Sequence, residues 1–182
     1  MPLLIVEGPR KAGKTFLVSN QTVCPVFKFD FNKNFRWWNL ERESRETHFW
    51  GLGKEIMLHE LNKGGYLKDG WLLVDRGILT NSVWGVFQKR ISKQQAIGDL
   101  SKFADLGLFE GVRFLLVEGQ WGEDRKKDIW DIDDIRGEEE RELFRSFSQA
   151  LLDLKVPVDV FPNNFDEDSL KRFNLSLQQI TR

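Results

Sequence analysis

Short apolar runs alternate with longer amphipathic stretches along this chain, a pattern that predicts strands separated by helices. Five apolar runs are predicted as strands, at residues 3–7, 23–29, 71–75, 112–118 and 156–161. The first run is apolar on both faces, which is typical of a central parallel strand covered by helices on each side. The alternation therefore predicts an α/β fold with a five-stranded parallel sheet and helices on both of its faces.

The stretches between these runs predict helices at residues 14–20, 41–63, 80–91, 92–106, 138–154 and 168–180. Ser92 is a suitable capping residue for the fourth helix, and Gly107 is suited to end it. Residues 31–40 have no clear period and predict an irregular wall. Residues 119–137 are rich in Gly, Asp, Lys and Arg and predict a lid, mobile and too polar for a core element.

Composition limits the class of protein. A chain of 182 residues suits one domain, residues 1–182, and a net charge of -1 argues against a generally basic nucleic-acid binder. The single cysteine, Cys24, excludes an internal disulfide and suits a reducing compartment. No apolar run approaches the length of a membrane span and no leader is evident, so we expect a cytoplasmic protein without a membrane partner.

The strongest chemical signal is the stretch at residues 8–15, which fits the phosphate-binding pattern G-x-x-x-x-G-K-[ST] between a predicted strand and a predicted helix. Gly8 and Gly13 let the backbone curl so that its N–H groups point at a polyphosphate. Lys14 would reach the β- and γ-phosphates, and the Thr15 hydroxyl would ligate Mg²⁺. The predicted nucleotide contacts are Gly8, Pro9, Arg10, Lys11, Ala12, Gly13, Lys14 and Thr15.

A second signal is the pair Asp75-Arg76 at the end of a predicted buried strand. In an open parallel sheet this edge faces the ligand crevice. Asp75 is then a candidate for Mg²⁺ or for the acceptor hydroxyl, and Arg76 is a candidate for the anionic group of the acceptor.

Together these motifs give a family resemblance. Residues 7–15 with Glu-Gly opening the loop, Asp75-Arg76 followed by Ser82, and a basic lid ending near Arg136 resemble the thymidylate kinase and deoxynucleoside kinase branch of P-loop kinases, across about the first 145 residues. The resemblance implies a three-layer α/β/α P-loop fold, ATP and Mg²⁺ as cofactors, and transfer of the γ-phosphate to a nucleoside or nucleoside monophosphate. It also implies a homodimer and a role in nucleotide metabolism.

The resemblance also suggests roles for individual residues. Arg76 corresponds to the arginine that binds the acceptor near its 5′ end, and the lid arginines Arg125 and Arg136 would steady the phosphates. Lys11 stands where some members place a catalytic arginine. Pro162 and Asn163, in a loop after the last strand, would lie beside the adenine.

Several alternatives stay open. Arg10 stands where thymidylate kinases usually have an Asp that recognises the acceptor sugar, and the base that takes the acceptor proton is Asp30 or Asp75. Trp37 and Trp38 either stack on the acceptor base or pack in a core or subunit contact. Two other functions compete with a nucleoside or nucleotide kinase: a kinase acting on a modified base, such as a hydroxymethylated pyrimidine, or on a terminus within DNA, and a P-loop NTPase or interaction module without an acceptor.

Overall fold

The computed structural model describes residues 2–28, 45–65, 70–119 and 134–182. Its centre is a five-stranded sheet in the order β2-β3-β1-β4-β5, with every neighbouring pair of strands parallel. The strands are β1 (Leu3–Glu7), β2 (Val26–Lys28), β3 (Leu72–Asp75), β4 (Val112–Gly119) and β5 (Val158–Asn163). β1 therefore lies in the middle of the sheet, between β3 and β4.

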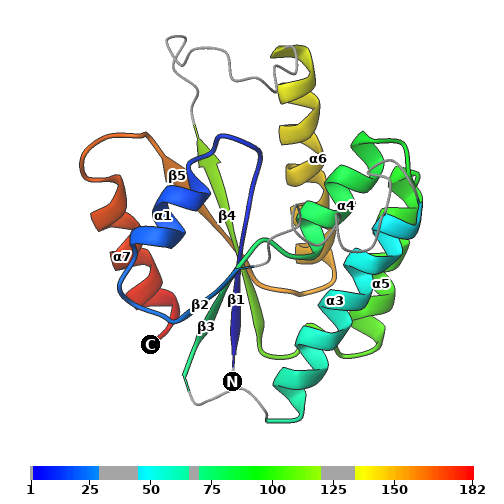
Figure 1. Ribbon diagram of the computed structural model, residues 1–182, viewed down its shortest axis with the longest axis horizontal. Helices are drawn as coiled ribbons and strands as arrows, with labels where there is room; N and C mark the ends of the chain where they lie inside the picture. Colours follow the sequence, from blue (N-terminus) through cyan, green and yellow to red (C-terminus); the bar gives the residue numbers. More distant parts are fainter. Residues whose placement is uncertain (1, 29–44, 66–69, 120–133) are drawn as a thin grey trace.

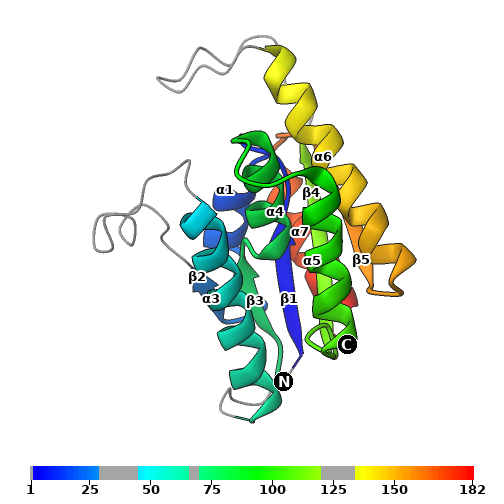
Figure 2. The same ribbon diagram turned by 90° about the vertical axis from the view of Figure 1, so that its right-hand side faces the viewer.

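Helices cover both faces of the sheet (Figures 1 and 2), which confirms the predicted three-layer α/β/α fold. They are α1 (Lys14–Asn20), α3 (Arg45–Lys63), α4 (Ile78–Phe87), α5 (Lys93–Asp105), α6 (Asp134–Asp153) and α7 (Ser169–Ile180). In Figure 1, α1 and α7 lie on one face and the other four helices lie on the opposite face. No helix within the described ranges is both long and apolar enough to cross a membrane.

β1 is the strand that joins the two hydrophobic layers. All five of its residues are buried. Leu3 and Ile5 belong to the core cluster under α4, α5 and α6, whereas Leu4 and Val6 belong to the cluster under α1 and α7. The apolar run is needed because neighbouring side chains of a strand point to opposite faces, and here both faces are covered.

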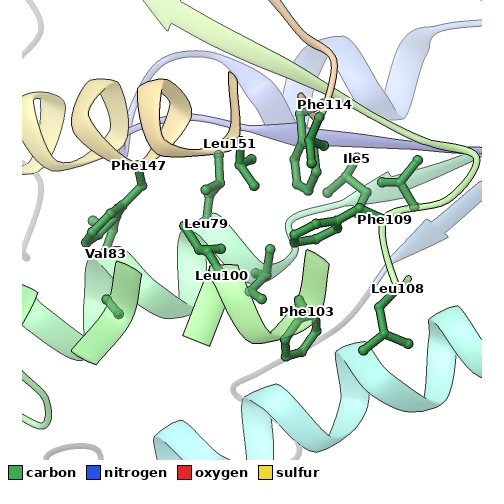
Figure 3. Packing of buried hydrophobic residues seen from close by; sticks show 14 of the residues in the cluster. Ile5, Leu79, Val83, Leu100, Phe103, Leu108, Phe109, Phe114, Phe147 and Leu151 are labelled. Carbon is green, nitrogen blue, oxygen red and sulfur yellow. The ribbon is translucent and has the colours of Figure 1, made fainter. Parts of the chain in front are cut away.

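The larger cluster fixes α4 and α6 against the sheet. Figure 3 shows Leu79 and Val83 of α4 and Phe147 of α6 in this layer, together with Phe114 of β4. Each of these four side chains is fully buried. Because a buried side chain of this size stabilises the fold by about 1.5–3 kcal/mol, this packing holds both helices in register with the sheet.

α4 differs from its predicted bounds at both ends. It begins at Ile78, two residues earlier than predicted, because the Glu7 side chain binds the N–H groups of its first turn. It ends at Phe87, four residues earlier than predicted. Lys89 has a left-handed φ of 57°, and the N–H groups of Arg90 and Ile91 both donate to the Gly85 carbonyl.

Three other predicted boundaries were wrong. The second strand begins at Val26 and not at residue 23. The fifth strand runs over Val158–Asn163, so Pro162 and Asn163 end a strand and do not form a loop. α6 starts at Asp134, so residues 134–137 belong to a helix and not to the lid. Gly137 does not stop this helix, since its cost of about 1 kcal/mol is offset by packing further along α6, where Phe144 is buried. The rest of the predicted lid, residues 120–133, and the predicted irregular wall at 31–40 lie outside the described residues.

Candidate active site

Residues 8–15, the predicted phosphate loop, lead from the carboxyl end of β1 into α1. In the sheet β1 lies between β3 and β4. Gly8 and Gly13 have φ values of 140° and 85°, which L side chains rarely adopt. A Cβ on Gly8 would lie 2.3 Å from the Val117 carbonyl oxygen, and a Cβ on Gly13 would lie 2.2 Å from Asn163 Nδ2. Both glycines are therefore required by the curl of the loop and by its close contact with β4 and β5.

Lys14 is buried at the start of α1, and its ammonium points back into the loop. Nζ donates to the Gly8 and Pro9 carbonyl oxygens at 2.6 Å each. Burial is the main cause that lowers the pKa of Lys14 to about 8, and Arg76 acts in the same direction. Three carboxylates raise this pKa and so favour the charged ammonium: Glu7, Glu140 and Asp75.

Arg10 is held by α6 and does not extend freely from the loop. Its backbone N–H donates to Glu140 Oε1 and its Nε donates to Glu140 Oε2, both at 3.0 Å. The guanidinium carbon lies 4.6 Å from the centre of the Trp84 ring and 5.7 Å from that of Phe87, both on α4. The sequence placed Glu140 only in the first turn of a helix, and the ion pair joins residues 130 positions apart.

β5 supports the other side of the loop through Asn163. Nδ2 of this buried side chain donates to the Ala12 carbonyl oxygen at 2.8 Å, and Oδ1 accepts from the Phe165 N–H at 3.1 Å. Asn163 thus fixes the loop backbone. The expected contact of Pro162 and Asn163 with an adenine stays a prediction.

Glu7 connects the loop to the Asp-Arg turn. Its buried carboxylate accepts from the N–H groups of Gly77 at 2.8 Å, Leu79 at 3.0 Å and Thr80 at 3.2 Å, and from the Thr80 hydroxyl. Burial raises the pKa of Glu7, whereas the hydrogen bonds from Thr80 and Gly77 lower it. Glu7 was not predicted as a site residue, although a lone carboxylate at the end of an apolar strand is a usable signal.

Asp75 and Arg76 lie next to this turn, as their place at the end of β3 predicted. Asp75 pairs in register with Val6, the residue before Glu7. Arg76 has a φ of 72°, and its N–H donates to the Val6 carbonyl oxygen at 3.0 Å. Both residues act on the pKa of Lys14, so the structure brings the two sequence motifs into one site.

Comparison with solved structures finds the same fold in several proteins. A thymidylate kinase from Candida albicans has a TM-score of 0.62 at 15% sequence identity, over 98% of this chain and 90% of that chain. A deoxyadenosine kinase from M. mycoides, solved with bound dATP, has a TM-score of 0.51 at 14% identity over the full length of both chains. The NadR protein in complex with NR has a TM-score of 0.61 at 14% identity, but this chain spans only 50% of its length.

This chain has the fold of thymidylate and deoxyadenosine kinases. The predicted resemblance to that branch of P-loop kinases is confirmed at the level of the fold. No protein-family model matches the chain, and no curated protein matches it.

Two residues at this edge of the sheet, Asp75 and Thr15, are candidates to hold Mg²⁺. Asp75 is 8% exposed, and its Oδ1 has no hydrogen-bond partner among the described residues. Thr15 is exposed at the start of α1. A buried unpartnered carboxylate oxygen and a hydroxyl are ligands of the kind that Mg²⁺ takes, with phosphates supplying further oxygens.

The structure does not describe several of the site residues that the sequence predicted. Asp30, Trp37, Trp38 and Arg125 lie outside the described residues. Arg136 lies in the first turn of α6, where the structure describes the backbone only. Their roles stay predictions.

A buried cluster of polar side chains, made of His48, Asn81 and Asp99, was not predicted. His48 Nε2 lies 3.2 Å from Asp99 Oδ2, and His48 Nδ1 lies 3.3 Å from Asn81 Nδ2. Gly51 and Gly85 make room for it, since a Cβ on Gly51 would lie 2.3 Å from Asn81 Oδ1 and one on Gly85 2.9 Å from His48 Nδ1. This cluster links α3, α4 and α5 and so fixes α4, the helix that follows Arg76.

Glu55 of α3 gives a testable dependence of stability on pH. It is 4% exposed, its Oε2 has no partner within the described ranges, and burial raises its pKa to about 8. Lys54 lowers this pKa and Glu7 raises it. Between its ordinary pKa of 4.5 and about 8, the folded state holds a proton that the unfolded chain has released, so the stability contribution of Glu55 decreases as the pH rises.

We expect Glu55→Gln to raise the melting temperature relative to the wild type by several degrees more at pH 8 than at pH 5, because the amide carries no charge to bury. Thermal unfolding at both pH values measures this difference. Glu60→Gln, an exposed position on the same helix, is the matched control. Equal effects of Glu55→Gln at the two pH values would contradict the assignment.

Proposed function

We propose that this protein is an ATP-dependent phosphotransferase that transfers the γ-phosphate to a nucleoside or nucleoside monophosphate. The observation that carries the proposal is the buried Lys14 ammonium inside a glycine-curled loop, with Asp75 and Arg76 at the same sheet edge. A cation held in this way serves polyphosphate binding. The kinase fold is consistent with it.

On the nucleotide side, Lys14 and the backbone N–H groups of the loop would hold the phosphates, and Thr15 with Asp75 would hold Mg²⁺. When bound, ATP supplies the phosphoryl group and Mg²⁺ neutralises part of its charge. Lys11, which is exposed on the loop, would add positive charge beside the transferred group. Arg125 and Arg136 are proposed to add positive charge in the same way.

On the acceptor side, Arg76 would bind near the 5′ end and align the hydroxyl that receives phosphate. Asp75 and Asp30 are the two candidates to accept the proton of that hydroxyl. Asp75 is supported by its buried Oδ1, which has no hydrogen-bond partner in the part of the chain that the structure describes. Trp37 and Trp38 remain proposed contacts of the acceptor base.

The arginine at position 10 supports a second candidate for the phosphate acceptor. The sugar-reading Asp expected from the family resemblance is replaced by an arginine whose charge is paired with Glu140. Recognition of the sugar by the usual route is therefore not available at this position. This favours, as a second candidate, a kinase that acts on a modified base or a terminus within DNA.

The deciding experiment incubates the protein and labelled ATP with nucleosides, nucleoside monophosphates and oligonucleotides. Transfer to a free nucleoside or monophosphate supports the main proposal. Transfer only to DNA, weakened by salt, selects the second candidate. Hydrolysis of ATP that no acceptor stimulates would instead select a P-loop NTPase without an acceptor.

We expect Arg76→Asn to lower kcat/KM for the acceptor by roughly 10- to 100-fold, the range for losing charged hydrogen bonds, with the ATP affinity nearly unchanged. Asn is chosen because it tolerates the left-handed backbone at this position. Steady-state kinetics with each substrate varied in turn measures both effects. An equal loss of ATP affinity would contradict the acceptor role.

We also propose the homodimer that the resemblance implies. α3 exposes four large apolar side chains that a second copy would bury: Phe49, Ile56, Met57 and Leu61. Sedimentation velocity should show a dimer that Met57→Lys dissociates. A monomer at all concentrations of the wild type would end this proposal.

A further inference from the structure

We propose that Glu140 is a positioning residue of the phosphate loop, setting the loop in the shape that receives the phosphates of ATP. The inference rests on the proposed function in one respect, since it assumes that the loop binds ATP. It assigns to α6 a role that the sequence motifs do not indicate.

The contact between Glu140 and Arg10 fixes two parts of one residue. One carboxylate oxygen accepts from the backbone N–H and the other from Nε, both at 3.0 Å. The first bond sets the path of the loop backbone, and the second sets the direction of the side chain. Glu140 is 3% exposed, so water competes little for either bond.

The Arg10 N–H belongs to the same peptide group as the Pro9 carbonyl, which binds the Lys14 ammonium. The Pro9 carbonyl oxygen accepts from Lys14 Nζ at 2.6 Å and from the Ala12 N–H at 3.3 Å. Because the Pro9 carbonyl and the Arg10 N–H belong to the same planar peptide group, Glu140 fixes the direction of that carbonyl when it binds the N–H. Glu140 thus positions Lys14 through one rigid unit.

Glu140 is itself held firmly enough to act as an anchor. Leu143 and Phe144 follow it in α6 and are buried in the large core cluster. On the far side of the loop, Asn163 of β5 binds the Ala12 carbonyl oxygen. The loop is therefore held between α6 and β5, with the rigid sheet beneath it.

Charge and position predict opposite results when Glu140 is removed. If its carboxylate acted only through charge, its removal would leave the site more positive, and at a pH well below the Lys14 pKa of about 8, where the ammonium stays charged, ATP would bind more tightly. If it positions the loop, its removal lets the peptide group turn and ATP binds more weakly. The sign of the change in affinity separates the two.

The test measures the dissociation constant of a non-hydrolysable ATP analogue with Mg²⁺ by calorimetry. We expect Glu140→Ala to weaken binding by about tenfold or more, the effect of losing hydrogen bonds to a charged group. Glu140→Gln keeps one oxygen acceptor and is expected to fall between Glu140→Ala and the wild type. Glu138→Gln, two residues away on α6 and exposed, is the matched control and should bind as the wild type does.

A second measurement needs no nucleotide. Amide hydrogen exchange of Arg10 should be slow in the wild type and at least about tenfold faster in Glu140→Ala, because its N–H loses a buried acceptor. Where Glu140→Ala does not fold, Glu140→Gln serves both measurements. Unchanged or tighter ATP binding in the Glu140 variants overturns the inference, as does unchanged exchange of the Arg10 amide. A wild type that fails to bind ATP refutes the proposed function instead, and the exchange result then still decides whether Glu140 sets the loop.

Discussion

Lys14→Ala is expected to abolish ATP binding and phosphoryl transfer while the protein stays folded. The ammonium is buried inside the loop, where its interaction with phosphate is little weakened by water. We expect kcat/KM to fall by about 10³ or more, as for other groups that stabilise the charge of a transferred phosphoryl group. Calorimetry with an ATP analogue and a transfer assay measure the two effects.

The fold should survive this change because Lys14 bears a charge whose burial is costly in the free protein. Its pKa of about 8 reflects that cost. Lys171→Ala, at an exposed position on α7, removes an equal charge away from the loop and should leave both affinity and transfer unchanged. Transfer at the wild-type rate by Lys14→Ala would refute the phosphate-loop assignment.

Glu7→Ala is expected to cause the largest loss of stability of any substitution considered. It leaves the buried N–H groups of Gly77, Leu79 and Thr80 without their acceptor at the start of α4. The expected cost is about 3–5 kcal/mol, as for breaking a buried charged network. For a chain of this size it corresponds to a decrease in melting temperature of roughly 10 °C or more.

Urea denaturation of Glu7→Ala, with the slope compared with that of the wild type, measures the free energy of unfolding. Glu7→Gln retains one oxygen acceptor and should lose about half as much. Glu139→Ala removes an exposed carboxylate of α6 and serves as the control. A Glu7→Ala protein as stable as Glu139→Ala would show that Glu7 does not hold the start of α4.

The parts of the fold that the sequence predicted depend on local patterns. The run at residues 3–6 is buried on both faces, as its unbroken apolar character indicates. Ser92 caps α5 by accepting from the Gln95 N–H at 3.1 Å, as predicted. The predicted start of α4 was wrong because it depends on hydrogen bonds to Glu7, which lies 70 residues or more away in the sequence.

The residues of the candidate site also divide into those that local sequence predicts and those that depend on long-range contacts. The loop motif could be found because its glycines, its lysine and its strand-to-helix context are neighbours in the chain. The role of Glu140 could not be predicted, because the three glutamates at residues 138–140 equally suit a solvated first turn of a helix. Only the fold buries the third one. His48 and Asp99 were missed for the same reason, since they are 51 positions apart.

The anchoring of the loop by Glu140 and Asn163 has a consequence for biosynthesis. Glu140 and Asn163, the side chains that shape residues 8–15, are made more than 120 residues after the loop itself. A nascent chain that has formed its first strand and helix still lacks both supports. The phosphate loop can thus take its final shape only after α6 and β5 have been made.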